Sequence, residues 1–175
     1  MRRTKPPYGR RERGSWVTTD LLDALRDIPA DAQVLFLYVR ALAGRRKWLP
    51  TLKRVACIMG MEPDELLPTW ERAARAGLFT DQWLGRLNLL TGGRSVFVTI
   101  TALNELRAQG VTEEDQMVLF RFLPYVDVQE RKLYVSRSSI AERARIPPAV
   151  VRKAFDGLAV AGVVADDNTF ASYLF

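Results

Sequence analysis

Apolar residues recur at helical spacing along most of the chain, and capping residues, prolines and glycines divide this pattern into short helices. Thr18 and Thr19 predict the start of a first helix, and Pro29 restarts the chain after it. Gly60 and Gly162 mark two later helix ends. The helices predicted from these signals cover 19–28, 34–44, 51–60, 63–77, 101–109, 112–123, 136–145 and 148–162.

A few short apolar stretches predict strands between these helices. Residues 87–90 and 96–100 flank the turn Thr91-Gly92-Gly93-Arg94 and predict a β-hairpin. Further strands are predicted at 78–79, at 133–135 and at 163–165, the last pairing with 169–175 across an acidic turn. The sequence therefore predicts a mainly α protein with small β-hairpin wings, in the α+β class.

The chain repeats itself at an offset of 85 residues. Residues 48–79 align without a gap on residues 133–164, so that Trp70 falls on Phe155 and Gly77 on Gly162. The helices before them also correspond, with a shift of two residues. The predicted organisation is a disordered basic arm (1–14), a first copy (15–100), a linker helix (101–110) and a second copy (111–175). The linker helix, with Thr101 as its cap, suits either a rigid spacer or a dimer seam.

The order strand, helix, tight turn, helix, strand over residues 132–164 resembles the winged helix-turn-helix family. Such modules usually bind duplex DNA. Two of them in one small chain resemble plasmid and phage replication initiators, in which the pair acts as a built-in pseudo-dimer on repeated sites. Transcription regulators share the same module. The resemblance implies a DNA-binding protein of a mobile element, acting in replication initiation or transcription regulation and associated with the bacterial nucleoid.

Most of the net charge of +6 lies in the N-terminal arm. Residues 1–13 hold six basic residues against Glu12, whereas the rest of the chain is nearly neutral. A basic arm with prolines and glycines suits a DNA minor groove or backbone, and a solubilising tail is the alternative. The arm residues proposed to contact DNA are Arg2, Arg3, Lys5, Arg10, Arg11 and Arg13.

The second helix of the second copy is the strongest candidate for a DNA contact. Arg152 and Lys153 face away from its apolar stripe, and Lys and Arg supply most nonspecific DNA affinity. The helix starts Pro147-Pro148-Ala149, which offers few groups that read bases, so DNA shape or arm contacts carry more specificity. A solvated basic face is the alternative. The candidates in this copy are Arg137, Arg143, Arg145, Ala149, Arg152 and Lys153.

The corresponding helix of the first copy is chemically different. Asp64 and Glu65 lie at its start and would repel phosphates, and Pro68 interrupts its interior. Asp64, Glu65 and the semi-exposed Leu67 are therefore candidates for protein contact. A basic side remains open to the DNA backbone, formed by Arg46, Lys47, Lys53, Arg54 and Arg94.

Catalysis finds little support in the residues. The chain has no His, the commonest general base and zinc ligand, and its single Cys57 is expected to be a buried structural thiol. Thr91-Gly92-Gly93-Arg94 lacks the ending of a phosphate loop. We therefore expect no enzyme, cofactor or metal. No apolar run approaches the ~20 residues of a membrane span, and the single Cys suits a reducing cytoplasm.

The expected partners are duplex DNA and either a second copy of the chain or a protein of the replication or transcription machinery. An alternative belongs to another class: a winged-helix adaptor that binds proteins and has no DNA specificity of its own. Strong salt dependence of DNA binding favours the first function, and an absence of binding to any duplex at low salt favours the second.

Overall fold

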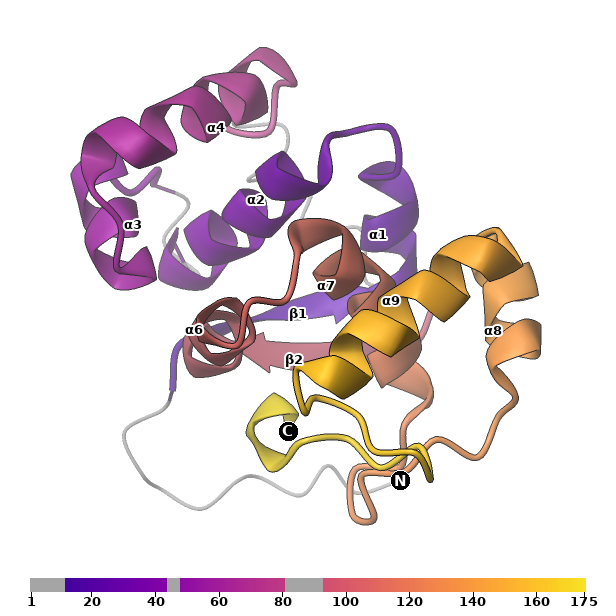
Figure 1. Cartoon of the computed structure of the whole chain (residues 1–175). Coiled ribbons are helices and arrows are strands. Elements are labelled where there is room, and N and C mark those ends of the chain that lie inside the picture. The colour runs from indigo at the N-terminus through magenta and orange to yellow at the C-terminus, as the bar shows by residue number, and fades with distance from the viewer. Residues whose placement is uncertain (1–11, 44–47, 81–92) are drawn as a thin grey trace, which may run out of the picture.

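The computed structural model describes residues 12–43, 48–80 and 93–175, and helices pack against one face of a two-stranded antiparallel sheet (Figure 1). The mainly α fold with a small β component is confirmed. The elements in chain order are β1 (Gly14–Thr18), α1 (Thr19–Ala24), α2 (Ala30–Ala43), α3 (Leu52–Met59), α4 (Pro63–Arg75), β2 (Ser95–Thr99), α6 (Ile100–Ala108), α7 (Glu113–Phe122), η1 (Leu123–Tyr125), α8 (Arg137–Ala144), α9 (Pro148–Val160) and η2 (Ser172–Leu174).

Hydroxyl side chains fix the start of five helices. The oxygens of Thr18, Thr51, Thr99, Thr112 and Ser136 each accept the backbone N–H three residues later, at 3.0–3.4 Å. These bonds satisfy N–H groups that have no partner inside the helix. The cap predicted at position 101 is wrong, because β2 ends at Thr99 and passes directly into α6.

The sheet joins two segments that lie far apart in the sequence. β1 pairs antiparallel with β2, and Trp16 faces Phe97 at the middle of the ladder. Val17 and Val98 point into the core, whereas Trp16 and Phe97 pack on the outer face with ring centroids 5.3 Å apart. Strand β1 was not predicted. The first strand of the predicted 87–100 hairpin lies outside the described residues.

The other predicted strands are much reduced. Leu78 and Phe79 lie in a turn, and residues 133–135 form no strand, so both predictions are wrong. Around the predicted second wing, single bridges join Lys132 to Thr169 and Val164 to Phe170. These bridges place 131–133 and 163–165 on opposite sides of 168–171. The last segment then turns into η2, which buries Leu174 and prevents a longer hairpin.

The bounds of four helices agree with the predicted repeat of 48–79 at 133–164. Helices α8 and α9 begin and end 85 residues after α3 and α4, and both pairs are joined through a left-handed residue, Gly60 or Arg145. The preceding helices, α2 and α7, also resemble each other at their starts. The buried Gln33 and Gln116 side chains each donate to the carbonyl five residues earlier, at 2.5 and 3.0 Å.

A further correspondence was missed from the sequence. The pair β1–α1 matches β2–α6 at an offset of 81 residues, and both pairs contain a strand, a capping threonine and a short helix. Trp16 and Phe97 are equivalent under this offset and also face each other in the ladder. Because equivalent residues meet in an antiparallel pair, an approximate two-fold axis passes between them. Helices α2 and α7, also equivalent, pack against each other.

One hydrophobic core includes residues of both copies. The cluster runs without a break from Val17 and Phe36 in the first copy to Phe120, Phe155 and Phe170 in the second. Helix α6, predicted as a linker, contributes buried side chains to this cluster. The division into 15–100 and 111–175 therefore stays a prediction. The hydrophobic core contains residues from both segments.

Candidate nucleic-acid interface

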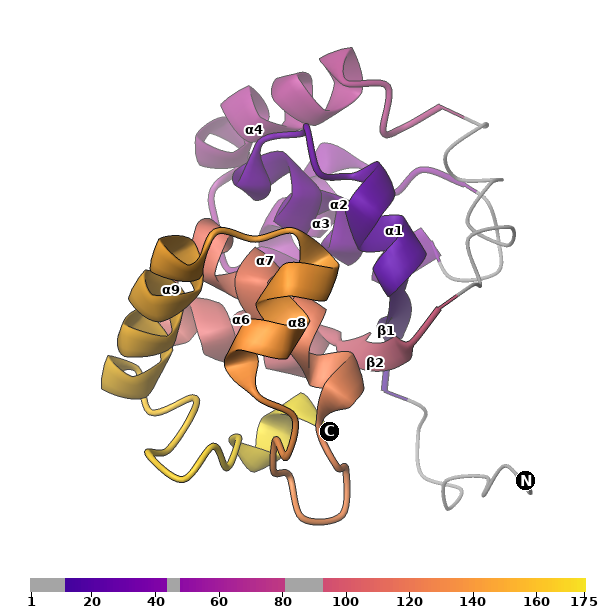
Figure 2. The same ribbon diagram turned by 90° about the vertical axis from the view of Figure 1, so that its right-hand side faces the viewer.

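The second helix-turn-helix is a tight corner between α8 and α9 (Figure 2). Arg145 adopts φ 52° and ψ 45°, and the N–H of Ile146 donates to the Ala141 carbonyl at 2.9 Å. Pro147 blocks any continuation of α8, and Pro148 begins α9 at the position where a missing N–H has no cost. These local preferences set the direction in which α9 leaves the turn.

Helix α9 has one buried face and one basic outer face. Val151, Ala154, Phe155 and Leu158 are buried in the core. The three predicted DNA-contact residues of this helix lie on the opposite side and are exposed: Ala149, Arg152 and Lys153. Within the described part of the chain, neither cation forms an ion pair or a hydrogen bond. Both charges are therefore available to an outside anion.

The equivalent helix α4 has the same length and the same position in its helix-turn-helix, but its exposed face is acidic at the start. Asp64 and Glu65 are exposed in its first turn, and Glu65 accepts the backbone N–H of Glu62 at 3.2 Å. Leu67 is 40% exposed beside them. Pro68, predicted to interrupt the helix, is accommodated within it.

The arginines of α4 are already paired with acids. Arg72 binds Asp31 of α2, and Arg75 lies 3.9 Å from Glu71. Burial raises the pKa of Asp31, but the hydrogen bond and charge of Arg72, together with hydrogen bonds from the Ala32 N–H and Thr69, hold this pKa below its ordinary value. Helix α4 therefore presents acids and arginines that lie beside acids, where α9 presents cations that have no ion partner among the described residues.

Arg137 has an internal role in addition to its predicted DNA contact. Its guanidinium lies 3.9 Å from the centre of the Phe155 ring and donates to Asn168 Oδ1 at 3.0 Å. Burial lowers the pKa of Arg137, against the opposing effect of Asp156. The side chain thus connects α8 to α9 and to the turn at 166–168. Fewer of its N–H donors remain available to DNA.

The remaining basic candidates are scattered over the surface. Arg54 stacks over Trp48 at 5.4 Å, and Arg94 over Tyr125 at 4.8 Å. Four further candidates are exposed side chains, namely Arg13, Lys53, Arg143 and Arg145. A last group lies outside the described residues: Arg2, Arg3, Lys5, Arg10, Arg11, Arg46 and Lys47. The candidates of the second copy lie on α8, on α9 and in the turn between them.

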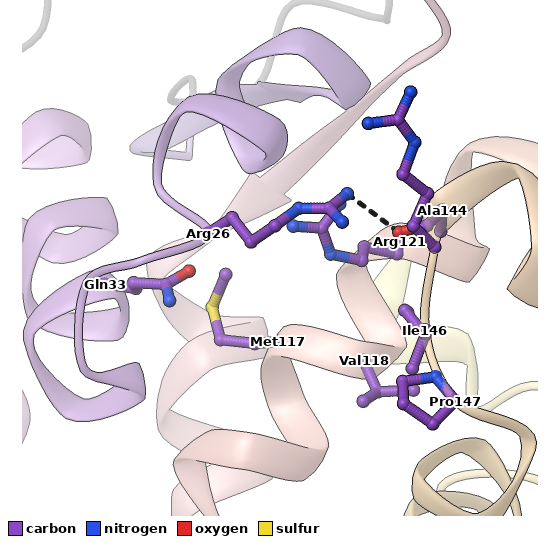
Figure 3. A pocket seen from close by; sticks show the side chains of 9 residues that line it. Arg26, Gln33, Met117, Val118, Arg121, Ala144, Ile146 and Pro147 are labelled. Carbon is purple, nitrogen blue, oxygen red and sulfur yellow. Dashed lines mark hydrogen bonds between the residues drawn. The ribbon is translucent and has the colours of Figure 1, made fainter.

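A pocket of about 190 Å³ lies directly behind the turn of the second motif (Figure 3). Arg26 reaches this pocket from the end of α1 and donates to the Ala144 carbonyl at 2.8 Å. Arg121 of α7 lies beside it, only 11% exposed, and binds Asp23 at 2.8 Å. Burial raises the pKa of Asp23, but the hydrogen bonds and charges of Arg26 and Arg121 together hold this pKa below its ordinary value. Residues of both copies therefore line this pocket and contact each other there.

The sequence reasoning missed the residues of this contact between the two copies, although a signal was present. Val17-Thr18 is followed by Leu22 and by Leu25-Arg26, and the same residue types recur at the same spacing from Val98 to Arg107. This shorter repeat lies at an offset of 81, whereas the helix-turn-helix repeat lies at 85. A search at a single offset therefore overlooks it.

The expected chemistry of Cys57 is corrected by the structure. Cys57 is exposed, so the prediction of a buried thiol is wrong. Its helix buries Val55 and Ala56, and position 57 lies off that stripe. Among the described residues, no group of three or more His, Cys, Asp or Glu could hold a metal ion. None of the helices in the described ranges is long and apolar enough to cross a membrane.

The left-handed turn residue gives a direct stability prediction. Arg145→Gly should leave the melting temperature unchanged or raise it, because glycine removes roughly 1 kcal/mol of backbone strain at this φ. Gly60→Ala is the matched opposite change, since a Cβ there meets nothing within 4 Å and only the strain is added. Thermal unfolding of both variants measures the effect. A clear loss of stability in Arg145→Gly would show that its side chain matters more than the strain.

No protein-family model matches the chain, and neither a curated protein nor a solved structure matches it significantly.

Proposed function

We propose that this chain binds duplex DNA through the outer face of α9, as a protein with two tandem winged helix-turn-helix units. The observation that carries the proposal is the pair Arg152 and Lys153, exposed and without an ion partner in the described ranges, on the second helix of a helix-turn-helix. In such motifs the second helix enters the major groove. Cations in that position neutralise phosphates and release counterions.

The small strand bridges support the winged form of the second unit. The segments 131–133, 168–171 and 163–165 lie next to one another and flank the two helices. The turn at their tip carries exposed Asp166 and Asp167, and Asp167 binds Lys132 at 3.1 Å. An acidic tip is unfavourable beside phosphates, so contact through α9 rather than through the wing is the better model.

We place the protein among DNA-binding proteins of plasmids or phages, acting in replication initiation or transcription regulation in the bacterial cytoplasm. The support is the architecture of two equivalent helix-turn-helix segments in one small chain. The experiment that tests this role is selection of bound fragments from random DNA. Enrichment of a defined site supports a replication or regulatory function, and recovery of unrelated sequences argues against it.

The N-terminal arm should add to DNA affinity. Deleting residues 1–12 removes five cations and one acid, and retains Arg13, whose carbonyl accepts the Ile100 N–H at 2.8 Å. Weaker binding with a flatter salt dependence is expected, by about 0.9 in log–log slope for each phosphate that the arm neutralises in the full-length chain. A fluorescence titration at several salt concentrations measures this. An unchanged slope would show that the arm is only a tail.

A second function rests on the surface of α4. Leu67 is exposed behind Asp64 and Glu65, and the nearby Arg72 and Arg75 are paired with acids. This face suits a protein partner or a second copy of the chain. If the whole protein were an adaptor, it would show no affinity for any duplex at low salt.

A further inference from the structure

Because β2 and α6 correspond to β1 and α1, we count them here as the start of the second copy. The two copies then exchange equivalent contacts across the approximate two-fold axis. Arg26 of the first copy donates to the carbonyl of Ala144, the last residue of α8, at 2.8 Å. Its equivalent Arg107 donates to the carbonyl of Met59, the last residue of α3, at 3.0 Å. The donors correspond at an offset of 81 and the acceptors at an offset of 85. Each arginine therefore holds the helix-turn-helix of the opposite copy.

A second pair of contacts follows the same rule. Arg121 of α7 binds Asp23 near the end of α1, whereas the equivalent Tyr38 of α2 donates to Asn104 of α6 at 2.8 Å. The chemistry differs, with an ion pair on one side and a neutral hydrogen bond on the other, but the positions match. Asn104 also donates to the Ile58 carbonyl at 3.0 Å, which strengthens the contact between α6 and α3.

The two acceptor carbonyls, of Met59 and Ala144, lie at the ends of α3 and α8, directly before the turn of each motif. The last carbonyls of a helix have no partner within the helix and need one from outside. Ala144 directly precedes the left-handed Arg145, from which α9 departs. The Arg26 guanidinium is hydrogen-bonded to the Ala144 carbonyl and so contacts the backbone directly before this turn (Figure 3).

We infer that each helix-turn-helix is positioned by the first helix of the other copy, so that the whole chain is the DNA-binding unit. Arg26 is the positioning residue for the second motif, and Arg107 is the positioning residue for the first. The consequence for DNA affinity rests on the proposed function. The exchange of contacts itself does not, and it can be tested without DNA.

Hydrogen exchange on two matched full-length variants tests the crossed pattern. In Arg26→Gln, exchange at the amides of Arg145 and Ile146, both of which are hydrogen-bonded in the turn, should accelerate about threefold to tenfold. The amides of Gly60 and Met61 should not change. Arg107→Gln should show the reverse pattern. Acceleration confined to the copy that carries the substitution, or equal in both turns, would overturn the inference.

Duplex binding then separates positioning from direct contact. Arg26→Gln should lower affinity for duplex DNA about threefold to tenfold in an otherwise unchanged chain, but cause no further loss when Arg152 and Lys153 are alanine. Arg107→Gln should leave affinity unchanged. If the Arg26→Gln loss adds fully to that of the double variant, Arg26 is itself a phosphate contact and the positioning role is wrong. If the wild-type chain binds no duplex, the proposed function fails while the exchange pattern stands.

Discussion

Replacing Arg152 and Lys153 together with alanine is expected to lower affinity for duplex DNA at least tenfold. Both side chains are exposed on α9, opposite its buried stripe, and have no ion partner in the described part of the chain. Their removal eliminates phosphate contacts and weakens binding to all sequences, and loss of a base contact by Arg152 would add ~1–3 kcal/mol at one position. Because both face away from the core, the melting temperature should stay within a few degrees.

A gel-shift series at fixed salt measures this loss against a matched variant. Asp64→Ala with Glu65→Ala changes the equivalent turn of α4 and should leave DNA affinity equal or slightly higher. It should instead disturb self-association or a protein partner. Glu65 accepts the Glu62 N–H, so this variant also loses about 0.5–1 kcal/mol of helix-start stabilisation. Equal loss of DNA affinity in both variants would mean that both helices lie in grooves.

Phe155→Ala should destabilise the entire chain by about 3–5 kcal/mol. The ring is buried, packs edge-on against Phe122 with centroids 4.9 Å apart, and supports the guanidinium of Arg137. Because one hydrophobic cluster contains residues of both copies, a single cooperative transition should move to lower denaturant.

Denaturant unfolding followed by two probes tests this expectation. Val160→Ala on the same helix is the control, since that side chain is 91% exposed and its loss should change stability by less than about 0.5 kcal/mol. Two separate transitions, of which only one moves in Phe155→Ala, would show that the copies fold as independent domains and would contradict the shared core.

Local signals explain why the helices were predictable. Thr51 and Ser136 cap their helices as the sequence indicates, and Gly60 and Gly162 adopt the left-handed conformation that ends a helix. Apolar spacing also gave the correct buried face of α9. These features depend on residues a few positions apart, which is the range over which a sequence pattern carries information.

The contacts between the two copies were not predictable in the same way. Strand β1 is five residues long and follows directly on the basic arm, and its partner β2 lies about 80 residues later. Pairing over that separation depends on the arrangement of the whole chain. Contacts such as Arg26 with the Ala144 carbonyl use a backbone acceptor, which no residue type reveals. The candidate site was thus predicted as a set of cations, but its support by the other copy was not.

The wings show a third kind of limit. Apolar pairs such as Val163-Val164 predicted strands, yet the structure gives single bridges because η2 turns back to bury Leu174. Tertiary burial there outweighs the local preference for an extended chain. The same competition placed Leu78 in a turn, where its side chain is fully buried.

The salt dependence of duplex binding by the full-length chain is the most direct test of the central claim. The measurement is a fluorescence titration of a labelled duplex at several salt concentrations. Binding at low salt, with log affinity falling linearly as log salt rises and with a slope that corresponds to several phosphates, is the predicted result. No binding to any duplex at low salt would contradict DNA binding and favour the protein adaptor.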